Sequence, residues 1–125
     1  MAKVSTVEIA AKLKLFEDNT TIYNQAYSMS AVTYTEHSTD RLILATNSGW
    51  QAVNMGGVTT GVFTEVKSDR PILVALNATT NSWSLGRGTE GGVIAAVSSF
   101  THIYVKNASL TNTATVNVAL TDENA

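Results

Sequence analysis

Two stretches of the sequence hold residue types that could do chemistry, and the first is rich in glycine. Gly86-x-Gly88-x-x-Gly91 matches the spacing with which nucleotide-binding proteins bring main-chain N–H groups to a pyrophosphate. That chemistry requires a helix directly after the glycines and an acidic residue about 20 positions later. Here the following residues, 93–97, have the composition of a strand, and Leu110 stands near the position of the acid. We therefore expect a loop between strands, with no nucleotide and no other cofactor.

The second stretch, Glu36-His37-Ser38-Thr39-Asp40, collects side chains that can bind a metal ion. A structural metal site needs three or four protein ligands, and the other histidine, His102, is far away in the sequence. A polar turn between two strands accounts for the same composition. We therefore predict no metal site.

Activated nucleophiles have no sequence signature in this chain. It has no cysteine, and no Gly-x-Ser-x-Gly motif marks a reactive serine. The carboxylates of Glu65 and Asp69 flank the end of an expected strand, where charged side chains are usually solvated. We expect no catalytic residue and a protein that is not an enzyme.

The two tryptophans, Trp50 and Trp83, are candidates either for core packing or for binding, and the sequence leaves both possibilities open. Trp83 shortly precedes Arg87, and an exposed indole next to an arginine is common at protein contacts and on surfaces that stack on sugars. His102 alternates with apolar neighbours in an expected strand, which favours a solvent-facing or interface position. The candidate interface residues are Trp83, Arg87, Gly88, Trp50, His102 and Tyr104.

Composition excludes several classes of partner. The 125-residue chain has 8 basic and 10 acidic residues, so it presents no broad positive field for nucleic acid. Its apolar runs are strand-length, far short of the ~20 residues that span a bilayer, and its first residues lack the core of a signal peptide. We expect no nucleic-acid partner, no membrane insertion, synthesis in the cytosol, and a single domain over residues 1–125.

The elements that position these residues are expected to be strands. Thr and Val are abundant, and Thr, Val, Ile and Tyr fit a pleated, half-buried surface. Short strands about every 8–12 residues are typical of a two-sheet sandwich or a barrel, and we predict an all-β, antiparallel two-sheet sandwich. The expected strands are residues 27–36, 41–46, 50–54, 62–67, 72–77, 93–97, 101–106 and 115–120.

Residues 5–16 fit two structures. Ser5 and Glu8 match a helix capping box, and Ile9, Leu13 and Phe16 fall at helical spacing. The same residues also alternate as a strand, and a turn-forming stretch at 18–21 suits a hairpin. We prefer the strand.

Pairing and burial follow from the same alternation. Residues 101–106 and 115–120 alternate on both sides of a turn-rich loop, which predicts an antiparallel hairpin. The runs 41–45, apolar from Leu42 on, and 72–76 have apolar residues on both faces, which predicts central strands. The expected core positions are Leu42, Leu44, Val62, Val66, Ile72, Val74, Leu76, Ile103, Val105, Val116, Val118 and Leu120.

Four stretches carry a resemblance to a known group of proteins. They are the apolar run that ends in Asn (72–77), the glycine-containing loop after it, the segment 101–107, and the Thr/Ala-rich segment 112–118. In this pattern, most of residues 1–120 resembles the small structural proteins of tailed-bacteriophage virions. The resemblance implies a jelly-roll-like sandwich, present in many copies on a capsid, neck or tail, with no catalytic residue.

The resemblance also implies a function. We expect a capsid decoration or cement protein of the virion that bridges shell subunits, with the major capsid protein or other virion proteins as partners. Further copies of the chain would join it in a homo-oligomer, for which we expect a trimer. A neck, tail or baseplate component is one alternative. Another is a carbohydrate-binding sandwich in which Trp50 or Trp83 stacks on a sugar and Arg41 helps to hydrogen-bond it.

Overall fold

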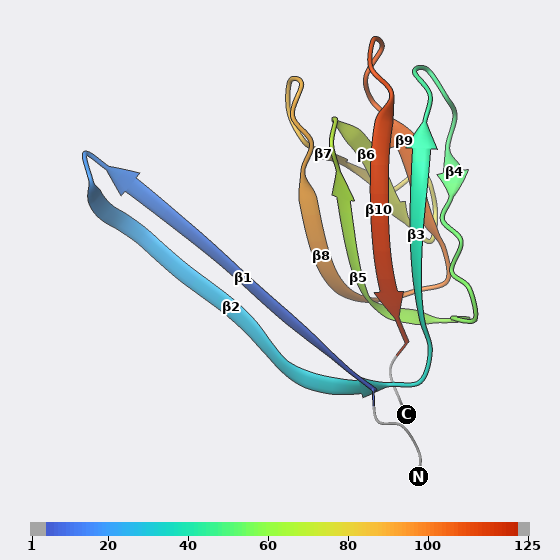
Figure 1. The fold of residues 1–125 in the computed structure, drawn as a ribbon, viewed down its shortest axis with the longest axis horizontal. Helices are drawn as coiled ribbons and strands as arrows, with labels where there is room; N and C mark the ends of the chain where they lie inside the picture. The colour runs from blue at the N-terminus through green and yellow to red at the C-terminus, as the bar shows by residue number, and fades with distance from the viewer. Residues whose placement is uncertain (1–4, 123–125) are drawn as a thin grey trace. The chain divides into compact units, whose positions relative to one another are not determined.

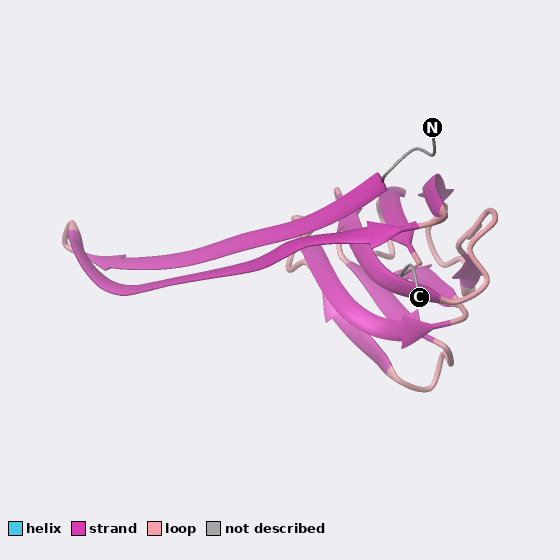
Figure 2. Cartoon of the chain, turned by 90° about the horizontal axis from the view of Figure 1, so that it is seen from below, coloured by secondary structure: helices cyan, strands magenta, loops and turns pink. Residues whose placement is uncertain are grey.

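Ten β-strands form the structure of residues 5–122, which are the residues that this computed structural model describes (Figure 1). No helix occurs among these residues, so the predicted all-β class is confirmed (Figure 2). The chain divides into two compact units, residues 1–34 and residues 35–125. The first contains two strands and the second contains eight.

The first unit is a long antiparallel hairpin of β1 (Ser5–Glu17) and β2 (Thr20–Tyr34). Asp18 and Asn19 form its turn with φ angles of 47° and 65°. Positive φ at both central residues is the pattern of a type I′ turn, whose twist matches that of the flanking strands. The preferred strand over residues 5–16 is confirmed, and the helical alternative is wrong.

The second unit is a sandwich of two four-stranded antiparallel sheets, as predicted. One sheet has the order β3-β10-β5-β8 and the other has the order β4-β9-β6-β7. In Figure 1 the first sheet faces the viewer and the second lies behind it. The expected sandwich domain over residues 1–125 therefore takes its strands from residues 37–121. Their bounds are β3 (His37–Leu44), β4 (Gln51–Ala52), β5 (Gly61–Ser68), β6 (Ile72–Leu76), β7 (Ser82–Leu85), β8 (Val93–Phe100), β9 (Ile103–Asn107) and β10 (Ala114–Thr121).

The strand pairs of the sandwich are nested along the chain. β3 pairs with β10, β4 with β9, β5 with β8, and β6 with β7, all antiparallel. The strands of the sandwich, β3 to β10, thus follow the path of a single long hairpin whose tip is the connection between β6 and β7. Two further pairings, β10 with β5 and β9 with β6, roll this hairpin into two sheets.

The predicted hairpin of residues 101–106 and 115–120 is wrong. Both segments contain strands, but β9 belongs to one sheet and β10 to the other. The connection between them crosses from sheet to sheet. Alternation predicts that each strand has one buried face, and two facing sheets satisfy that condition as well as a hairpin does.

The core lies between the two sheets and follows period-2 burial along each strand. In β10, for example, Ala114, Val116, Val118 and Leu120 are buried and alternate with more exposed residues. Nine of the predicted core positions belong to the cluster of buried apolar residues between the sheets, and Leu42 and Leu76 pack against this cluster. The buried cluster consists of Leu44, Val53, Val58, Val66, Ile72, Val74, Leu85, Phe100, Ile103, Val105, Ala114, Val116, Val118 and Leu120.

Three expectations about individual strands are wrong. Val62 is only half-buried and lies outside the core cluster, next to the shift in the register of β5 with β8 between Gly61 and Phe63. β3 is an edge strand and not a central one, and its Ile43 is 66% exposed. β7 was not predicted at all, because it is short and half of it is serine.

Candidate interaction surfaces

The six predicted interface residues lie in three separate places of the sandwich. One place is the β4 edge of the β4-β9-β6-β7 sheet, where Trp50 precedes β4, His102 precedes β9 and Tyr104 lies in β9. Trp83 lies in β7, at the other side of the same sheet. Arg87 and Gly88 lie in the connection from β7 to β8. They therefore do not form one surface.

Trp83 is a packing residue. It pairs with Val74 of the neighbouring strand, and its half-buried side chain packs against the core cluster. The indole Nε1 is buried and has no hydrogen-bond partner among the described residues. Since a buried indole N–H usually finds a partner, this donor reduces the stability that the ring contributes.

His102 and Tyr104 form a stacked aromatic pair. Their ring centroids are 5.6 Å apart and the ring planes differ by 5°. Period-2 alternation places both residues on the face opposite the buried Ile103 and Val105, as predicted. The Cα partners of Tyr104 are Ala52 on β4 and Ala75 on β6, so the ring lies between small residues. Both rings lie on the outer side of the sheet, and one face of each ring is turned to the other.

Asn77 positions the start of β9, where this pair begins. Its Oδ1 accepts the main-chain N–H of Thr101 at 2.8 Å, and its Nδ2 donates to the Ser99 carbonyl at 3.2 Å. Its own N–H donates to the His102 carbonyl at 2.9 Å. The φ of Asn77 is 68°, a conformation that Asn tolerates better than most residues. The asparagine after the apolar run thus fastens the β8–β9 connection.

Arg87 and Gly88 belong to a tight turn. The N–H of Arg87 donates to the Glu90 carbonyl at 2.9 Å, and the N–H of Glu90 donates to the Arg87 carbonyl at 3.0 Å. Gly88 and Thr89 are the two central residues of this turn. The φ of Gly88 is 65° and the φ of Thr89 is not positive, which is the pattern of a type II′ turn. The Gly86–Gly91 stretch is therefore a turn followed by a strand, and it lacks the helix that a dinucleotide site requires.

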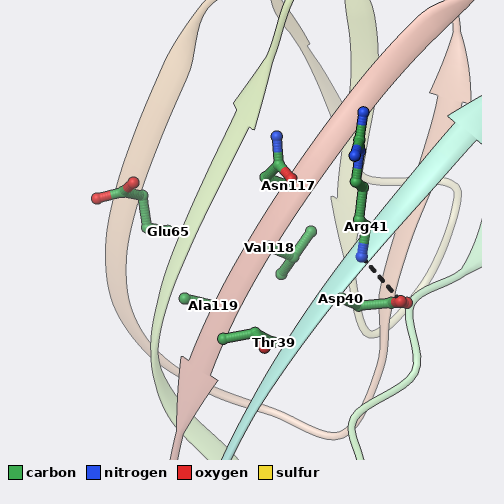
Figure 3. Close-up of a pocket in the computed structure, with 7 residues that line it drawn as sticks. All are labelled: Thr39, Asp40, Arg41, Glu65, Asn117, Val118 and Ala119. Atoms are coloured by element: carbon green, nitrogen blue, oxygen red, sulfur yellow. Dashed lines mark hydrogen bonds between the residues drawn. The ribbon is translucent and has the colours of Figure 1, made fainter.

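An open depression of about 460 Å³ lies on the outer face of the β3-β10-β5-β8 sheet (Figure 3). Arg41 of β3 and Glu65 of β5 stand on either side of β10, which contributes Asn117 and the small residue Ala119. A guanidinium, an amide and a carboxylate around a small floor residue can hydrogen-bond polar groups of a partner. Thr39, Asp40 and Val118 complete the lining.

Most of this depression was not predicted from the sequence. Arg41 and Glu65 were considered for separate reasons, Thr39 and Asp40 only as part of the candidate metal-binding stretch, and Asn117 and Ala119 not at all. The available signal was the alternation of β10, which puts Asn117 and Ala119 opposite the buried valines. Which strands lie beside β10 could not be read from that alternation.

Asp40, one of the residues that we considered as a metal ligand, binds main-chain groups instead. The Asp40 carboxylate accepts the N–H groups of Arg41 and Asn54, each at 2.9 Å, and so holds the loop before β5 (Figure 3). Within residues 5–122, no three histidine, aspartate or glutamate side chains gather where they could hold a metal ion. The described part of the chain also contains no helix that is long and apolar enough to cross a membrane.

Comparisons with known proteins do not assign the chain to a family: no family model matches it, and no curated protein matches it.

Proposed function

We propose that this chain is a structural protein of a tailed-bacteriophage virion and acts by binding neighbouring subunits, without a catalytic step. Its first candidate role is that of a capsid decoration protein that bridges shell subunits. Attachment of this kind relies on many modest contacts repeated by symmetry, so that avidity replaces a single tight interface. A place in the neck, tail or baseplate is the alternative role.

The observation that carries the proposal is the β1–β2 hairpin. Two-stranded hairpins are marginally stable on their own, and a ribbon of two strands has no second layer within its own unit. Here about a quarter of the chain forms such a ribbon, in strands of 13 and 15 residues. A neighbouring protein subunit that covers one face would supply the missing layer.

The pairing register of this ribbon puts apolar residues opposite one another at alternate positions. Alternate Cα partners along it are largely apolar or aromatic, while the positions between them are mostly polar or small. Leu15, which belongs to the apolar row, is 46% exposed. The apolar row pairs Val7 with Val32, Ile9 with Met29, Ala11 with Tyr27 and Leu15 with Tyr23, interrupted by Leu13 with Gln25. The other row pairs Ala10 with Ser28, Lys12 with Ala26 and Lys14 with Asn24.

The nested strand pairs support a jelly-roll form for the sandwich, which is part of this proposal. In a jelly roll, eight strands form two Greek keys across two sheets, and viral capsid proteins and lectins both use this architecture. The pairing of β3 with β10, β4 with β9, β5 with β8 and β6 with β7 is the nesting expected when one hairpin is rolled into such a form, and it supports this part of the proposal. Because viral capsid proteins and lectins share this architecture, it supports both of the candidate functions proposed here.

The direct test is the composition of purified particles. Particles produced from the genome that encodes this chain would be separated into heads and tails and analysed by mass spectrometry. We expect many copies in the head fraction. Copies in the tail fraction only would support the alternative role, and absence from both fractions would refute the proposal.

A matched pair of variants tests the contribution of the hairpin. Leu15→Glu places a charge in the apolar row, whereas Ala10→Glu places the same charge on the other face of the ribbon. We expect Leu15→Glu to reduce the copies bound per particle at least about tenfold, because a buried unpaired carboxylate is costly, and Ala10→Glu to bind normally. Equal binding by both variants would show that the apolar row is not the contact.

A second candidate function is carbohydrate binding, and the stacked pair of His102 and Tyr104 favours it. An aromatic ring on the outer side of a sheet can stack on the apolar face of a sugar through the face that is not turned to the neighbouring ring. On a glycan array, this function predicts binding that Tyr104→Ala removes and Trp83→Phe retains. No binding by the unmodified chain would eliminate it.

A further inference from the structure

The sandwich has four edge strands, and three of them are protected against pairing with another chain. β4 and β7 have only 2 and 4 residues, and β3 carries Asp40 and Arg41. Short length and charge are the usual means by which edges avoid further pairing. β8 has eight residues, Val93–Phe100, with neither a charged residue nor a proline. It is the unprotected edge of the described sandwich.

The direction of the main-chain groups of β8 follows from its pairing with β5. The Ser68 N–H donates to the Gly92 carbonyl at 2.9 Å, so Gly92 points its main chain toward β5. Along an antiparallel pair, residues alternate between those that bond the partner strand and those that point away from it. The register runs without a shift from Lys67↔Val93 to Phe63↔Val97. Val93, Ala95 and Val97 therefore turn their N–H and C=O groups to the open edge.

The same three residues carry exposed apolar side chains. Val93 is 59% exposed and Val97 is 49% exposed, and Ala95 between them is exposed as well. Ile94 and Ala96, which alternate with them, are half-buried. One strand edge thus combines unpaired main-chain groups with an uncovered apolar row. A partner strand would satisfy the first and cover the second.

We propose that β8 is a homodimer edge, to which β8 of a second copy adds in the antiparallel direction about a two-fold axis at Ala95. In this register Val93 lies opposite Val97 of the partner subunit, twice by symmetry, and Ala95 lies opposite its equivalent. Each of these pairs points its main-chain groups at the other and exchanges two hydrogen bonds. The β3-β10-β5-β8 sheet of one copy and the same sheet of the second copy then form one continuous eight-stranded sheet across the dimer.

A second copy of this chain fits the edge because the strand is complementary to itself. Every pair in the proposed register joins two apolar residues, and cross-strand apolar pairs stabilise a sheet. On β5, the strand beside β8, the partners of Val93 and Ala95 are the charged residues Lys67 and Glu65, both exposed. The two Glu65 residues of the dimer would lie three strand spacings apart, about 14 Å, where solvent and salt screen their repulsion.

This contact does not rest on the proposed virion function, and it differs from the trimer that the resemblance implies. A two-fold contact at β8 predicts a mass of about twice 13.3 kDa for the purified chain. It can be measured without any virion protein. Its failure would leave the particle experiments above unaffected.

Light scattering over a concentration series tests the dimer with two matched variants. Ala95→Lys places two ammonium groups opposite each other at the axis, whereas Ile43→Lys adds the same charge to the outer face of the opposite edge strand. We expect a dimer for the unmodified chain and for Ile43→Lys, and for Ala95→Lys a folded monomer that still unfolds in one cooperative thermal transition. An equimolar mixture of Ala95→Lys and Ala95→Glu should form the dimer again.

Disulfide trapping tests the register, since the chain has no cysteine of its own. Cα atoms of a hydrogen-bonded antiparallel pair are about 5.5 Å apart, within the range of a disulfide. Under mild oxidation we expect Ala95→Cys to give a covalent dimer. Val97→Cys should not, because its position faces Val93 of the partner subunit.

Three results would overturn the proposal. They are a monomer at every concentration, an oligomer that Ala95→Lys leaves intact, and an Ala95→Cys chain that does not cross-link. A monomer whose binding to particles is lost with Ala95→Lys would show that a different protein occupies the edge.

Discussion

The side-chain amide of Asn107 donates a hydrogen bond to the main-chain carbonyl of Leu44, 3.1 Å away, and so joins the end of β9 in one sheet to the end of β3 in the other. The same Nδ2 also donates to the carbonyls of Ala45 at 3.3 Å and Asn112 at 2.8 Å, and Oδ1 accepts the N–H of Ser109 at 2.8 Å. Asn107 is 4% exposed. This buried amide therefore holds the crossing of the chain from β9 to β10.

Replacing Asn107 should destabilise the sandwich. Asn107→Ala leaves buried carbonyl and N–H groups without partners, and we expect a loss of about 2–3 kcal/mol in the free energy of unfolding. Urea denaturation measures this loss. Asn117→Ala is the control, because Asn117 is exposed on the outer face, and it should change stability by less than about 0.5 kcal/mol. Equal losses in both variants would contradict the role assigned to the buried amide.

Gly91 should not tolerate even a methyl group. A Cβ at this position would come within 2.6 Å of the Asp69 carbonyl carbon and would also meet the main chain of Ser68. Main-chain atoms cannot move aside cheaply, so Gly91→Ala should lower the free energy of unfolding by about 2 kcal/mol or more.

Gly49→Ala is the matched control for this glycine. Nothing described lies within 4 Å of a Cβ at Gly49, and its φ is not in the positive range. Thermal unfolding of the two variants side by side should show a lower melting temperature for Gly91→Ala only. A stable Gly91→Ala chain would mean that β8 can shift away from β5.

The ring of Trp83 should stabilise the core by packing, while its buried indole N–H, which has no hydrogen-bond partner among the described residues, should reduce that stabilisation. Trp83→Phe removes the unpaired indole N–H and keeps an aromatic ring, so we expect a change of less than about 1 kcal/mol in the free energy of unfolding. Trp83→Ala removes the ring and should cost about 3 kcal/mol. Chemical denaturation distinguishes the two, and an Ala variant as stable as the Phe variant would argue that the ring is not part of the packing.

Asp122 should protect the main chain that leads into β3. Its Oδ1 accepts the N–H groups of Thr35 at 2.8 Å and Glu36 at 3.0 Å, and its own N–H donates to the Glu36 carbonyl at 3.1 Å. Asp122→Ala should speed amide hydrogen exchange at Glu36 and cost about 1–2 kcal/mol of stability. Asp122→Asn retains an acceptor oxygen and should lie closer to the unmodified chain, so a larger effect of Asn than of Ala would contradict this account.

The strands and most of the core could be predicted from the sequence because both depend on local alternation. Val116, Val118 and Leu120 repeat at period 2, and only a strand puts such residues on one face. Ile103 and Val105 give the same signal in β9. The preference for a strand over residues 5–16 rested on the same period, supported by the turn residues Asp18 and Asn19.

The candidate surfaces were only partly predictable. His102 and Tyr104 were expected to share a face because they are two residues apart in one strand, and their rings stack. Arg41 and Glu65 are far apart in the sequence and come to the same depression because β10 pairs with both of their strands. No local pattern specifies that shared neighbour.

The sequence by itself determined that the chain is all-β and, for most of the strands, which residues form them and which face is buried. Only the tertiary structure decided that β9 and β10 lie in different sheets, that Ile43 lies at an edge, and that Trp83 packs inward. The physical reason is that alternation is a property of one segment, whereas a strand's partner depends on the area buried and the hydrogen bonds made by all the strands together.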